Sequence, residues 1–260
     1  MSAPSAPARE HATGRSSRQY PWLRGALVKL AHDDPEAAGR IIAGLLPVQS
    51  AIVAGPVDYD LTIAELGTTF SVTIAGGRAY VNDIGAPRRR REAEFHLAAD
   101  ALTLAELIAG VPHKIGRFRG AARVSGRKRR VKPLRAIPAA RISLAEAARA
   151  GARLEPSLVF HTFPYVVQAA WSRGHSFTVA QQIAGDPPET WYISVGDGRG
   201  LEIVTTPPEG GADATVTMTR EAFVHLLRGE PVPPGHRPFI RGDRAAVALL
   251  KSWLDRAQGL

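Results

Sequence analysis

The residues that could do chemistry are scattered along this chain and form no common catalytic or metal-binding motif. The sequence of 260 residues contains no cysteine, which excludes disulfides, thiolate nucleophiles and cysteine zinc sites. Its eight histidines include no pair at the spacing of a helical zinc motif. Neither the Gly-x-Ser-x-Gly motif of serine hydrolases nor the Gly-x-x-x-x-Gly-Lys phosphate loop occurs. We therefore predict no metal, no cofactor and no enzymatic activity.

Two short motifs suggest a function that their context does not support. The glycine-rich run 196–200 precedes the strand-like segment 201–204, whereas a dinucleotide site requires a helix at that point. The adhesion tripeptide Arg241-Gly242-Asp243 lies where a predicted strand gives way to a capped helix. The first motif is therefore predicted to be a hairpin turn, and the second is not interpreted as an adhesion site.

Acidic and histidine side chains provide the remaining candidates for acid–base chemistry. His96 and His225 lie beside predicted apolar faces, which is typical of structural histidines. The acidic candidates are Asp58, Asp60, Glu65, Glu92 and Glu94. The sequence does not bring these carboxylates together, and we expect them at solvated strand edges.

Positive charge is concentrated in two clusters. The formal net charge is +9, and the excess lies in segment 88–91 and in segment 117–141, which contains Arg127, Lys128, Arg129 and Arg130. Such clusters attract the phosphates of nucleic acid or of anionic lipids. An arginine-rich coding bias is the alternative explanation, since only five of the 33 basic residues are lysines.

The composition indicates a folded protein without membrane-spanning helices. Apolar residues make up 45% and charged residues 22%, as in globular domains. Segment 1–20 is rich in Ser, Pro, Ala and Arg and lacks the apolar stretch of a secretory signal, so it is predicted to be a disordered tail. The longest uncharged stretches, 41–57 and 156–172, are shorter than a transmembrane helix. We expect a cytoplasmic protein.

The chain is predicted to be a tandem repeat, and this repeat determines the elements that position its side chains. Segments 23–35 and 69–74 match 144–156 and 190–195 at one offset of 121. Three more matches are 62–64 with 178–180 at 116, 107–110 with 226–229 at 119, and 124–126 with 240–242 at 116. The expected organisation is a tail over 1–20, a first copy over 21–138 and a second copy over 139–260.

Alternating apolar residues predict strands within each copy. Segments 70–74 and 191–195 each place apolar residues on one face and polar residues on the other, which predicts one solvated face. Gly76-Gly77 and Asp197-Gly198 follow these strands and suit two-residue hairpin turns. Segments 95–98 and 214–218 are predicted to continue an antiparallel sheet.

Helical periodicity occurs before and after each predicted sheet. Asp100 and Thr219 are cap residues of helices that end at Gly110 and Gly229, and Asp243 caps a closing amphipathic helix. Segments 37–53 and 158–171 are predicted to be the leading helices, interrupted by Pro47 and Pro164 respectively.

Several short motifs of the second copy resemble a known family. They are Asp197-Gly198, 214–223, 226–229 and 240–243 followed by Leu249-Leu250, and they occur between Pro156 and Leu260. The first copy carries the weaker counterparts Gly76-Gly77, 107–110 and 120–126. With the order of the elements, these motifs are similar to those of the sterol carrier protein 2 family. The whole chain resembles tandem bacterial members of that family.

The resemblance implies an α+β fold with two tandem domains and a role in lipid binding or transport. Each domain would be a mostly antiparallel five-stranded sheet with helices packed on one face. An apolar tunnel between sheet and helices would bind a sterol, a fatty acid or an acyl-CoA without catalytic residues. The candidate ligand-binding residues in the second copy are Phe160, Phe163, Val166, Trp191, Ile193, Met218, Phe223, Leu226, Leu227, Val247, Leu250 and Trp253.

The first copy departs from the family pattern at its end. Arg127 replaces the Asp243 cap, and Pro133 interrupts the segment expected to form the closing helix. We therefore expect the first copy to be degenerate and the second to hold the better site. Three alternatives stay open. The apolar residues form a closely packed core, or the chain is a basic module that binds an anionic membrane or, less favoured, nucleic acid through Arg127, Lys128, Arg129 and Arg130. The third alternative is an enzyme of unrecognised type that uses pocket carboxylates or histidines.

Overall fold

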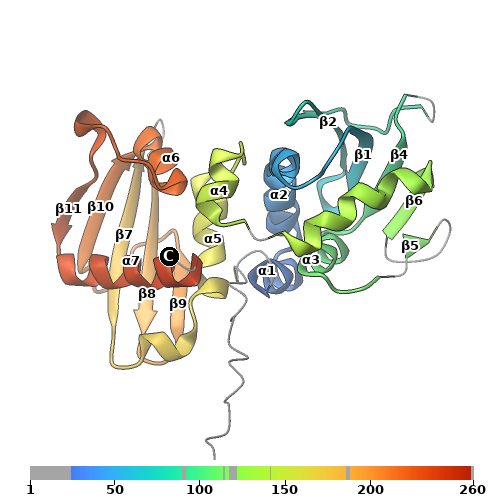
Figure 1. Ribbon diagram of the computed structural model, residues 1–260. Coiled ribbons are helices and arrows are strands. Elements are labelled where there is room, and N and C mark those ends of the chain that lie inside the picture. The colour runs from blue at the N-terminus through green and yellow to red at the C-terminus, as the bar shows by residue number, and fades with distance from the viewer. Residues whose placement is uncertain are drawn as a thin grey trace, which may run out of the picture.

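The chain folds into two α+β modules of the same topology (Figure 1). The computed structural model describes residues 25–89, 92–113, 115–116, 122–140, 142–185 and 188–258, so the predicted tail lies outside the described residues. Both modules combine one sheet with helices, which confirms the predicted α+β fold of two tandem domains.

The first module contains a six-stranded sheet in the order β3-β2-β1-β4-β6-β5. Its central pair, β1 and β4, is parallel, whereas β1–β2, β2–β3 and β4–β6 are antiparallel. The strands are β1 Val57–Ile63, β2 Thr68–Ala75, β3 Arg78–Asp83, β4 Phe95–Ala99, β5 Ile115–Gly116 and β6 Ala122–Gly126.

The second module repeats this sheet without an equivalent of the two-residue β5. Its order is β11-β10-β7-β8-β9, and its central pair, β7 and β10, is again parallel. The strands are β7 Phe177–Ala184, β8 Glu189–Gly196, β9 Gly200–Val204, β10 Ala214–Thr219 and β11 Phe239–Gly242. Both sheets are therefore mixed, because each contains one parallel pair at its centre.

Strand register shows how the two copies align. Tyr59 pairs with Val72 and Phe95, and Val179 pairs in the same two directions with Ile193 and Ala214. Strand β1 therefore aligns with β7 at an offset of 120, and the offset of 116 inferred from 62–64 and 178–180 was wrong. The connection after β7 is one residue longer than that after β1, since 184–188 separate the pair Ile183 and Glu189, whereas 64–67 separate Ile63 and Thr68.

A glycine ends the last strand of both sheets for the same steric reason. Gly126 pairs with Phe95 and Gly242 with Ala214, which agrees with the offset of 116 predicted for this segment. Their φ angles are +90° and +86°, and an added Cβ would lie 2.8 Å from the Glu94 carbonyl oxygen and 2.2 Å from that of Asp213. Only glycine allows this approach.

The hairpin turns differ between the modules. In the first, Ala75 pairs with Arg78, so Gly76-Gly77 forms the predicted two-residue turn with positive φ at both positions. In the second, Gly196 pairs with Gly200, so three residues form the turn, one more than predicted.

Equivalent helices follow the predicted start and stop residues. Asp100 accepts a hydrogen bond from Thr103 N at 2.6 Å before α3, and Thr219 accepts one from Ala222 N at 3.1 Å before α6. The helices of the first module are α1 Leu27–Asp33, α2 Pro35–Leu45, α3 Ala101–Ala109 and the 3₁₀ segments η2 Leu46–Ala51, η3 Ala64–Leu66 and η4 Lys128–Ala139. Those of the second are α4 Leu144–Arg149, α5 Pro156–Val166, α6 Arg220–Arg228, α7 Arg244–Gln258 and the 3₁₀ segments η5 Ala169–Ser172 and η6 Pro234–His236.

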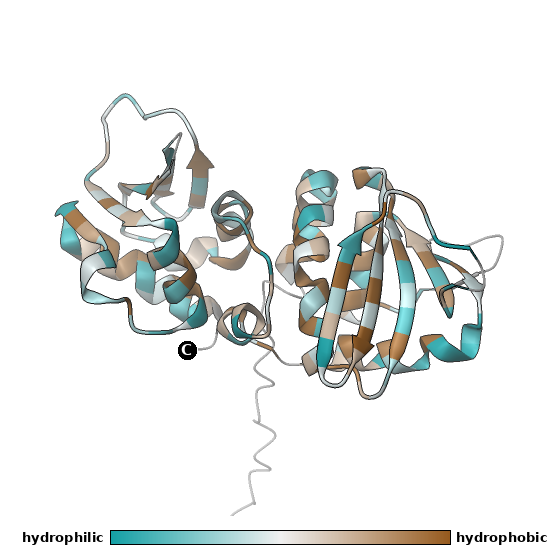
Figure 2. Ribbon diagram, turned by 90° about the horizontal axis from the view of Figure 1, so that it is seen from above, coloured by the Kyte–Doolittle hydropathy of each residue, from teal (hydrophilic) through white to brown (hydrophobic). Residues whose placement is uncertain are grey.

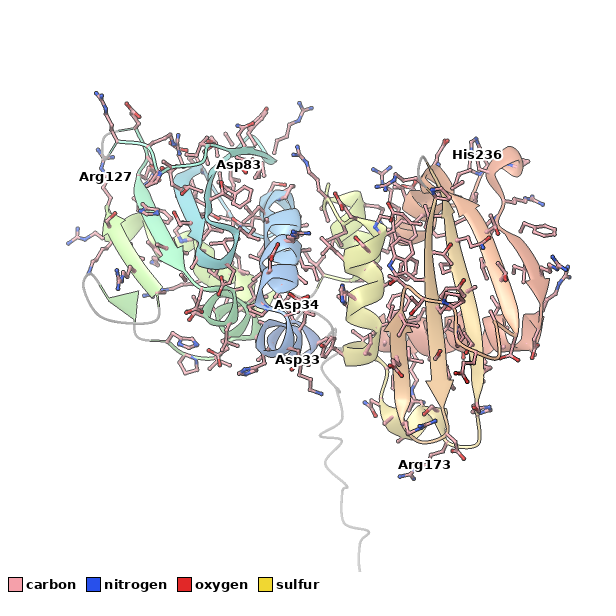
Figure 3. The ribbon with its side chains drawn as sticks, turned by 180° about the vertical axis from the view of Figure 1, so that it is seen from behind. Asp33, Asp34, Asp83, Arg127, Arg173 and His236 are labelled. Carbon is pink, nitrogen blue, oxygen red and sulfur yellow. The ribbon has the colours of Figure 1, made fainter. Side chains whose placement is uncertain are left out.

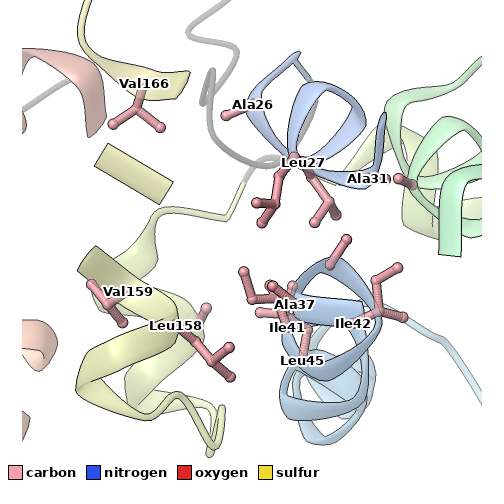
Figure 4. Packing of buried hydrophobic residues seen from close by; sticks show 14 of the residues in the cluster. Ala26, Leu27, Ala31, Ala37, Ile41, Ile42, Leu45, Leu158, Val159 and Val166 are labelled. Atoms are coloured by element: carbon pink, nitrogen blue, oxygen red, sulfur yellow. The ribbon is translucent and has the colours of Figure 1, made fainter. Parts of the chain in front are cut away.

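The modules meet through their leading helices. Helices α1 and α2 lie next to α5 between the two sheets, which form the outer parts of the molecule (Figure 1). Figure 4 shows Leu27 of α1 and Ile41 of α2 facing the side of α5 that carries Leu158, and all three side chains are buried. The strands alternate between hydrophobic and hydrophilic residues (Figure 2), as expected for sheets with one face toward helices.

The segment after β6 is the main structural difference between the modules. The segment η4, Lys128–Ala139, is a 3₁₀ helix that contains Pro133 and Pro138, whereas α7 is a regular α-helix capped by Asp243. Both segments lie across the helix-bearing face of their sheet (Figure 1). The predicted loss of the closing α-helix in the first copy is confirmed.

Across the described ranges, none of the helices combines the length and the apolar composition needed to cross a bilayer.

Candidate functional site: two apolar cavities

The first module contains an apolar cavity of about 720 Å³ between its sheet and its helices, and this cavity is partly open to solvent. Protein interiors are close-packed and contain few voids larger than a water molecule, so this volume exceeds an ordinary packing defect. Its wall combines residues of α2, η2, the sheet, α3 and η4, among them Ile42, Leu45, Leu61, Leu97, Leu104 and Leu107.

The uncharged polar groups in this cavity wall pair with each other. The Tyr59 hydroxyl donates a hydrogen bond to Gln49 Oε1 at 2.7 Å. Burial raises the pKa of Tyr59, and the hydrogen bond to Gln49 lowers it by a smaller amount. Tyr59 is therefore a neutral donor, and its ring stacks on Phe95 with 5.0 Å between the centroids.

The segment η4 gives the first cavity a basic rim. Val131, Leu134 and Ile137 are half-buried against the core, while Lys128, Arg129, Lys132 and Arg135 are exposed and also line the cavity. No acidic residue belongs to the described part of this wall. The described part of the first cavity therefore combines an apolar interior with a positive opening.

The second module contains an equivalent cavity of about 540 Å³ between its sheet, α5, α6 and α7. Its aromatic side chains gather around Phe160, whose ring centroid lies 5.3 Å from that of Phe163 and 5.7 Å from that of Phe223. The charged residues of its wall are Glu230, Lys251 and Asp255, of which Lys251 and Asp255 pair at 2.5 Å. Among the residues described for this cavity there is thus no excess of positive charge.

Ten of the twelve side chains expected to bind a ligand line this second cavity. They are Phe160, Phe163, Val166, Ile193, Met218, Phe223, Leu226, Leu227, Val247 and Leu250. Leu226 is 44% exposed, which places it at the opening. Their role in binding stays a prediction.

The two tryptophans of that set lie outside the cavity wall. The ring centroid of Trp191 lies 4.8 Å from that of Phe160. The ring centroid of Trp253 lies 6.0 Å from that of Phe177 and 5.7 Å from that of His175. Both are buried. Helical spacing identified Trp253 as part of the apolar face of α7, but that face is wider than the cavity, and Trp253 packs on β7.

Each cavity also includes residues from the other copy. Ile41 of α2 lines the second cavity, and Ile142 and Ala147 from the start of the second copy line the first. The modules are fixed to each other nearby, because Arg153 N donates to the Gly44 carbonyl at 2.8 Å and the Tyr165 hydroxyl donates to Asp33 at 2.9 Å. The geometry of both cavities therefore depends on the contact between the modules.

A polar cluster on the opposite face of the first sheet was also a candidate site. Asp60 is fully buried, and its carboxylate accepts hydrogen bonds from Arg88 N and Arg88 Nε, both at 2.7 Å. The Arg88 guanidinium also donates to Asp58 at 2.8 Å. The expectation that Asp60 lies at a solvated strand edge was wrong, because the segment after β3 covers this face.

The rest of this cluster is also internally paired. The Thr62 hydroxyl lies 2.7 Å from the Thr69 hydroxyl and 2.8 Å from His96 Nε2. Burial lowers the pKa of His96, with a smaller opposing effect from the Asp60 carboxylate. With Asp60 held by Arg88 and Thr62 held on both sides, the cluster supports the fold rather than presenting a free acid and base.

The remaining carboxylate candidates have structural partners too. Glu65 accepts a hydrogen bond from Ala101 N at 2.8 Å at the start of α3, and Glu94 forms an ion pair with Arg130. The described residues contain no group of three or more His, Cys, Asp or Glu that could hold a metal ion.

Sequence reasoning missed two features of these sites. The first cavity is larger than the second, although the first copy has lost its closing helix. The alternation of Val131, Leu134 and Ile137 with basic residues in η4 could have indicated a substitute wall.

The second missed feature is Gln181, a polar residue on the inward face of β7 that lines the second cavity. Its spacing of two from Val179 and Ile183 places it on that face.

Comparisons with known proteins give no family assignment. No protein-family model and no curated protein matches the chain. A solved structure of a double mutant of the sec-alkylsulfatase PisA1 aligns with 41% of this chain and 17% of its own, at 18% identity and a TM-score of 0.33. A structure of the stereoselective inverting sec-alkylsulfatase Pisa1 from Pseudomonas sp. aligns with 59% of this chain and 21% of its own, at 17% identity and a TM-score of 0.33. The matched region thus spans about a fifth of those structures, and the likeness supports no conclusion about activity.

Proposed function

We propose that this protein binds a hydrophobic or amphipathic ligand without chemical conversion, in an apolar cavity of each module. The observation that carries this proposal is the presence of cavities of about 720 and 540 Å³ at equivalent places in the two modules. Both volumes fall within the range of ligand pockets, roughly 300–1,000 Å³. A packed core would have filled both spaces.

The expected ligands are sterols, fatty acids or acyl-CoA. Each methylene moved from water into an apolar site contributes about 0.8 kcal/mol, so ten contribute on the order of 8 kcal/mol before the cost of association. A net affinity in the micromolar range corresponds to about 8 kcal/mol after that cost is subtracted, so we expect it for ligands that bury more than ten methylenes. The basic rim of the first cavity favours an amphiphile with an anionic head group, since Lys128, Arg129, Lys132 and Arg135 line it and its described wall contains no acidic residue.

The first prediction tests this proposal with a fluorescent fatty acid and two variants, in each of which a tryptophan fills one of the cavities. Dansyl-undecanoic acid should saturate the first cavity at micromolar concentration and be displaced by unlabelled fatty acid. Leu134→Trp should reduce that binding at least tenfold, because the larger ring occupies the first cavity. Val247→Trp, which fills the second cavity in the same way, is the matched control and should affect only ligand bound there.

Circular dichroism of each variant provides the folding control. Mass spectrometry of lipids that copurify with the native chain should in addition identify a ligand class. If the folded protein binds neither a fluorescent fatty acid nor a fluorescent sterol saturably, and no lipid copurifies, the proposal is overturned.

A second function, attachment to an anionic membrane surface, is favoured by the exposed basic residues next to the first cavity. Arg127, Lys128 and Arg129 form no ion pair within the described part of the chain. Arg127 lies at the outer edge of the first module (Figure 3). Attachment there would bring the opening of the first cavity close to the source of a lipid.

A further inference from the structure

The second cavity contains a buried hydrogen-bonding group without a partner. Gln181 is 8% exposed and lines this cavity, and its Nε2 atom is buried without a hydrogen bond. Among the described residues, three other buried side-chain atoms lack a hydrogen bond, but their residues, Glu94, His113 and His225, each form an ion pair. Among the described residues with such an atom, Gln181 is the one that forms neither a side-chain hydrogen bond through that atom nor an ion pair.

The register of β7 shows that Gln181 lies on the face of the sheet toward the helices. It lies on β7 between Val179 and Ile183, which are both buried on the face toward the helices, and it pairs in register with Val216 of β10. The neighbouring Gln182 belongs to the other face and accepts a hydrogen bond from the Thr217 hydroxyl at 2.9 Å. Two adjacent glutamines on one strand therefore differ, since one is paired and the other is held in an apolar cavity.

In the first module, the position equivalent to Gln181 is occupied by an apolar residue. The alignment of β1 with β7 places Leu61 at the position of Gln181, and Leu61 lines the first cavity. The polar pair of that cavity, Tyr59 and Gln49, is satisfied internally. Buried polar groups in proteins are nearly always hydrogen-bonded, and an unpaired one requires an explanation.

We propose that Gln181 is a ligand-recognition residue, and that the second cavity selects an uncharged apolar molecule carrying a carbonyl or hydroxyl oxygen that accepts a hydrogen bond from this amide. The proposal rests on the proposed function and assigns a ligand class to one of its two cavities. The ligand is uncharged because the interior polar groups, Gln181 and Thr162, are neutral, and because Glu230 and Asp255 outnumber Lys251 in the wall. The two cavities then differ in specificity, with anionic amphiphiles favoured in the first.

The test uses a methionine that reports on this cavity alone. Met218 lines the second cavity, and the chain has one other methionine, Met1. In full-length protein labelled with ¹³C in the methionine methyl groups, the Met218 signal, assigned by Met218→Leu, follows ligand entry. The probes are naphthalene and 2-acetylnaphthalene, which share a ring system and differ in one carbonyl acceptor.

We expect 2-acetylnaphthalene to shift the Met218 signal with an affinity about tenfold higher in the native protein than in Gln181→Leu, which corresponds to about 1.4 kcal/mol. Naphthalene should bind both proteins within twofold. Gln181→Met, which keeps the side-chain length without the amide, should behave like Gln181→Leu and serves if the leucine variant does not fold. Gln182→Leu, on the opposite face, should leave both affinities unchanged.

The outcomes separate this inference from the proposed function. If both probes bind and neither affinity changes in the Gln181 variants, the role of Gln181 is overturned while ligand binding in the cavity stands. If neither probe shifts Met218 in folded native protein, the second cavity is not a ligand site, and the inference fails with it.

Discussion

At the scale of single residues, the first module contains a buried charge pair that holds the outer face of its sheet. Asp60 has no exposed surface, and its two carboxylate oxygens accept hydrogen bonds from the backbone and side chain of Arg88. The same guanidinium reaches Asp58, which also accepts a hydrogen bond from Thr73 at 2.9 Å. Arg88 belongs to a basic cluster that resembled a partner-binding surface, but this arginine neutralises a carboxylate of its own module.

We expect Arg88→Met to destabilise the protein by about 3 kcal/mol, measured by urea unfolding. Removal of one partner of a buried ion pair leaves the other charge uncompensated and costs about 3–5 kcal/mol, and the low end applies because Arg88 is partly exposed. Arg89→Met is the matched control, since the exposed Arg89 forms no ion pair among the described residues and should change stability by less than about 0.5 kcal/mol. Equal stability of the two variants would contradict the structural role of Arg88.

At the scale of elements, η4 and α7 close equivalent cavities by different means. In α7, a regular helix brings Leu250 and Val247 to the cavity and pairs Lys251 with Asp255. In η4, two prolines prevent an α-helix, and half-buried apolar residues alternate with basic ones. The rim of the second cavity therefore contains an ion pair, whereas the rim of the first carries basic side chains that form no ion pair with the described residues.

We expect the triple change Arg127→Ser, Lys128→Ser and Arg129→Ser to weaken binding to phosphatidylglycerol vesicles about a hundredfold. Each basic side chain near an anionic surface contributes about 1 kcal/mol, and this attraction falls with salt. Cosedimentation at low salt measures the change. Arg130 stays in the sequence because its ion pair with Glu94 gives it a structural role.

The control for this prediction is a second triple variant, which has the same change in net charge but carries it in the second module. Arg173→Ser, Arg199→Ser and Arg237→Ser together remove three exposed charges from the second module. Arg173 lies far from Arg127, at the opposite end of the molecule (Figure 3). An equal loss of binding in both triple variants would assign adsorption to net charge, and stronger binding of the native protein to duplex DNA than to vesicles would favour the nucleic-acid alternative.

At the scale of the whole molecule, the contact between the modules completes both cavities. Gly44 lies against the second copy, and an added Cβ would be 2.2 Å from the Arg153 carbonyl oxygen. Ile41, three residues earlier, lines the second cavity, whereas Ala147 of α4 lines the first. Displacement at Gly44 would therefore move a wall of each cavity.

We expect Gly44→Ala to destabilise the protein by about 2 kcal/mol, as overpacking of a close contact does, and to weaken ligand binding in both cavities. Thermal unfolding and titration with dansyl-undecanoic acid and 2-acetylnaphthalene measure the two effects. Gly210→Ala is the control, because an added Cβ there meets no atom within 4 Å. Unchanged binding in Gly44→Ala would show that each module forms its cavity independently.

The sequence by itself determined the repeat, the helix caps and the alternation of the strands. These features depend on neighbouring residues, so periodicity and cap chemistry were sufficient to locate them: Asp100 and Thr219 cap their helices, and Gly126 and Gly242 end equivalent strands. Ten of the side chains expected at a ligand site share one cavity for the same reason, because inward-facing positions of a strand or helix recur at fixed spacing.

Only the tertiary structure decided which apolar faces enclose space and which are packed. Trp253 follows the helical spacing of Leu250, yet it contacts Phe177 and leaves the cavity wall. The parallel pairing of β1 with β4, the burial of Asp60 by Arg88 and the unpartnered amide of Gln181 likewise depend on contacts between distant segments. Local sequence determines the direction in which a side chain points, but the volume in front of it depends on the packing of every element around it.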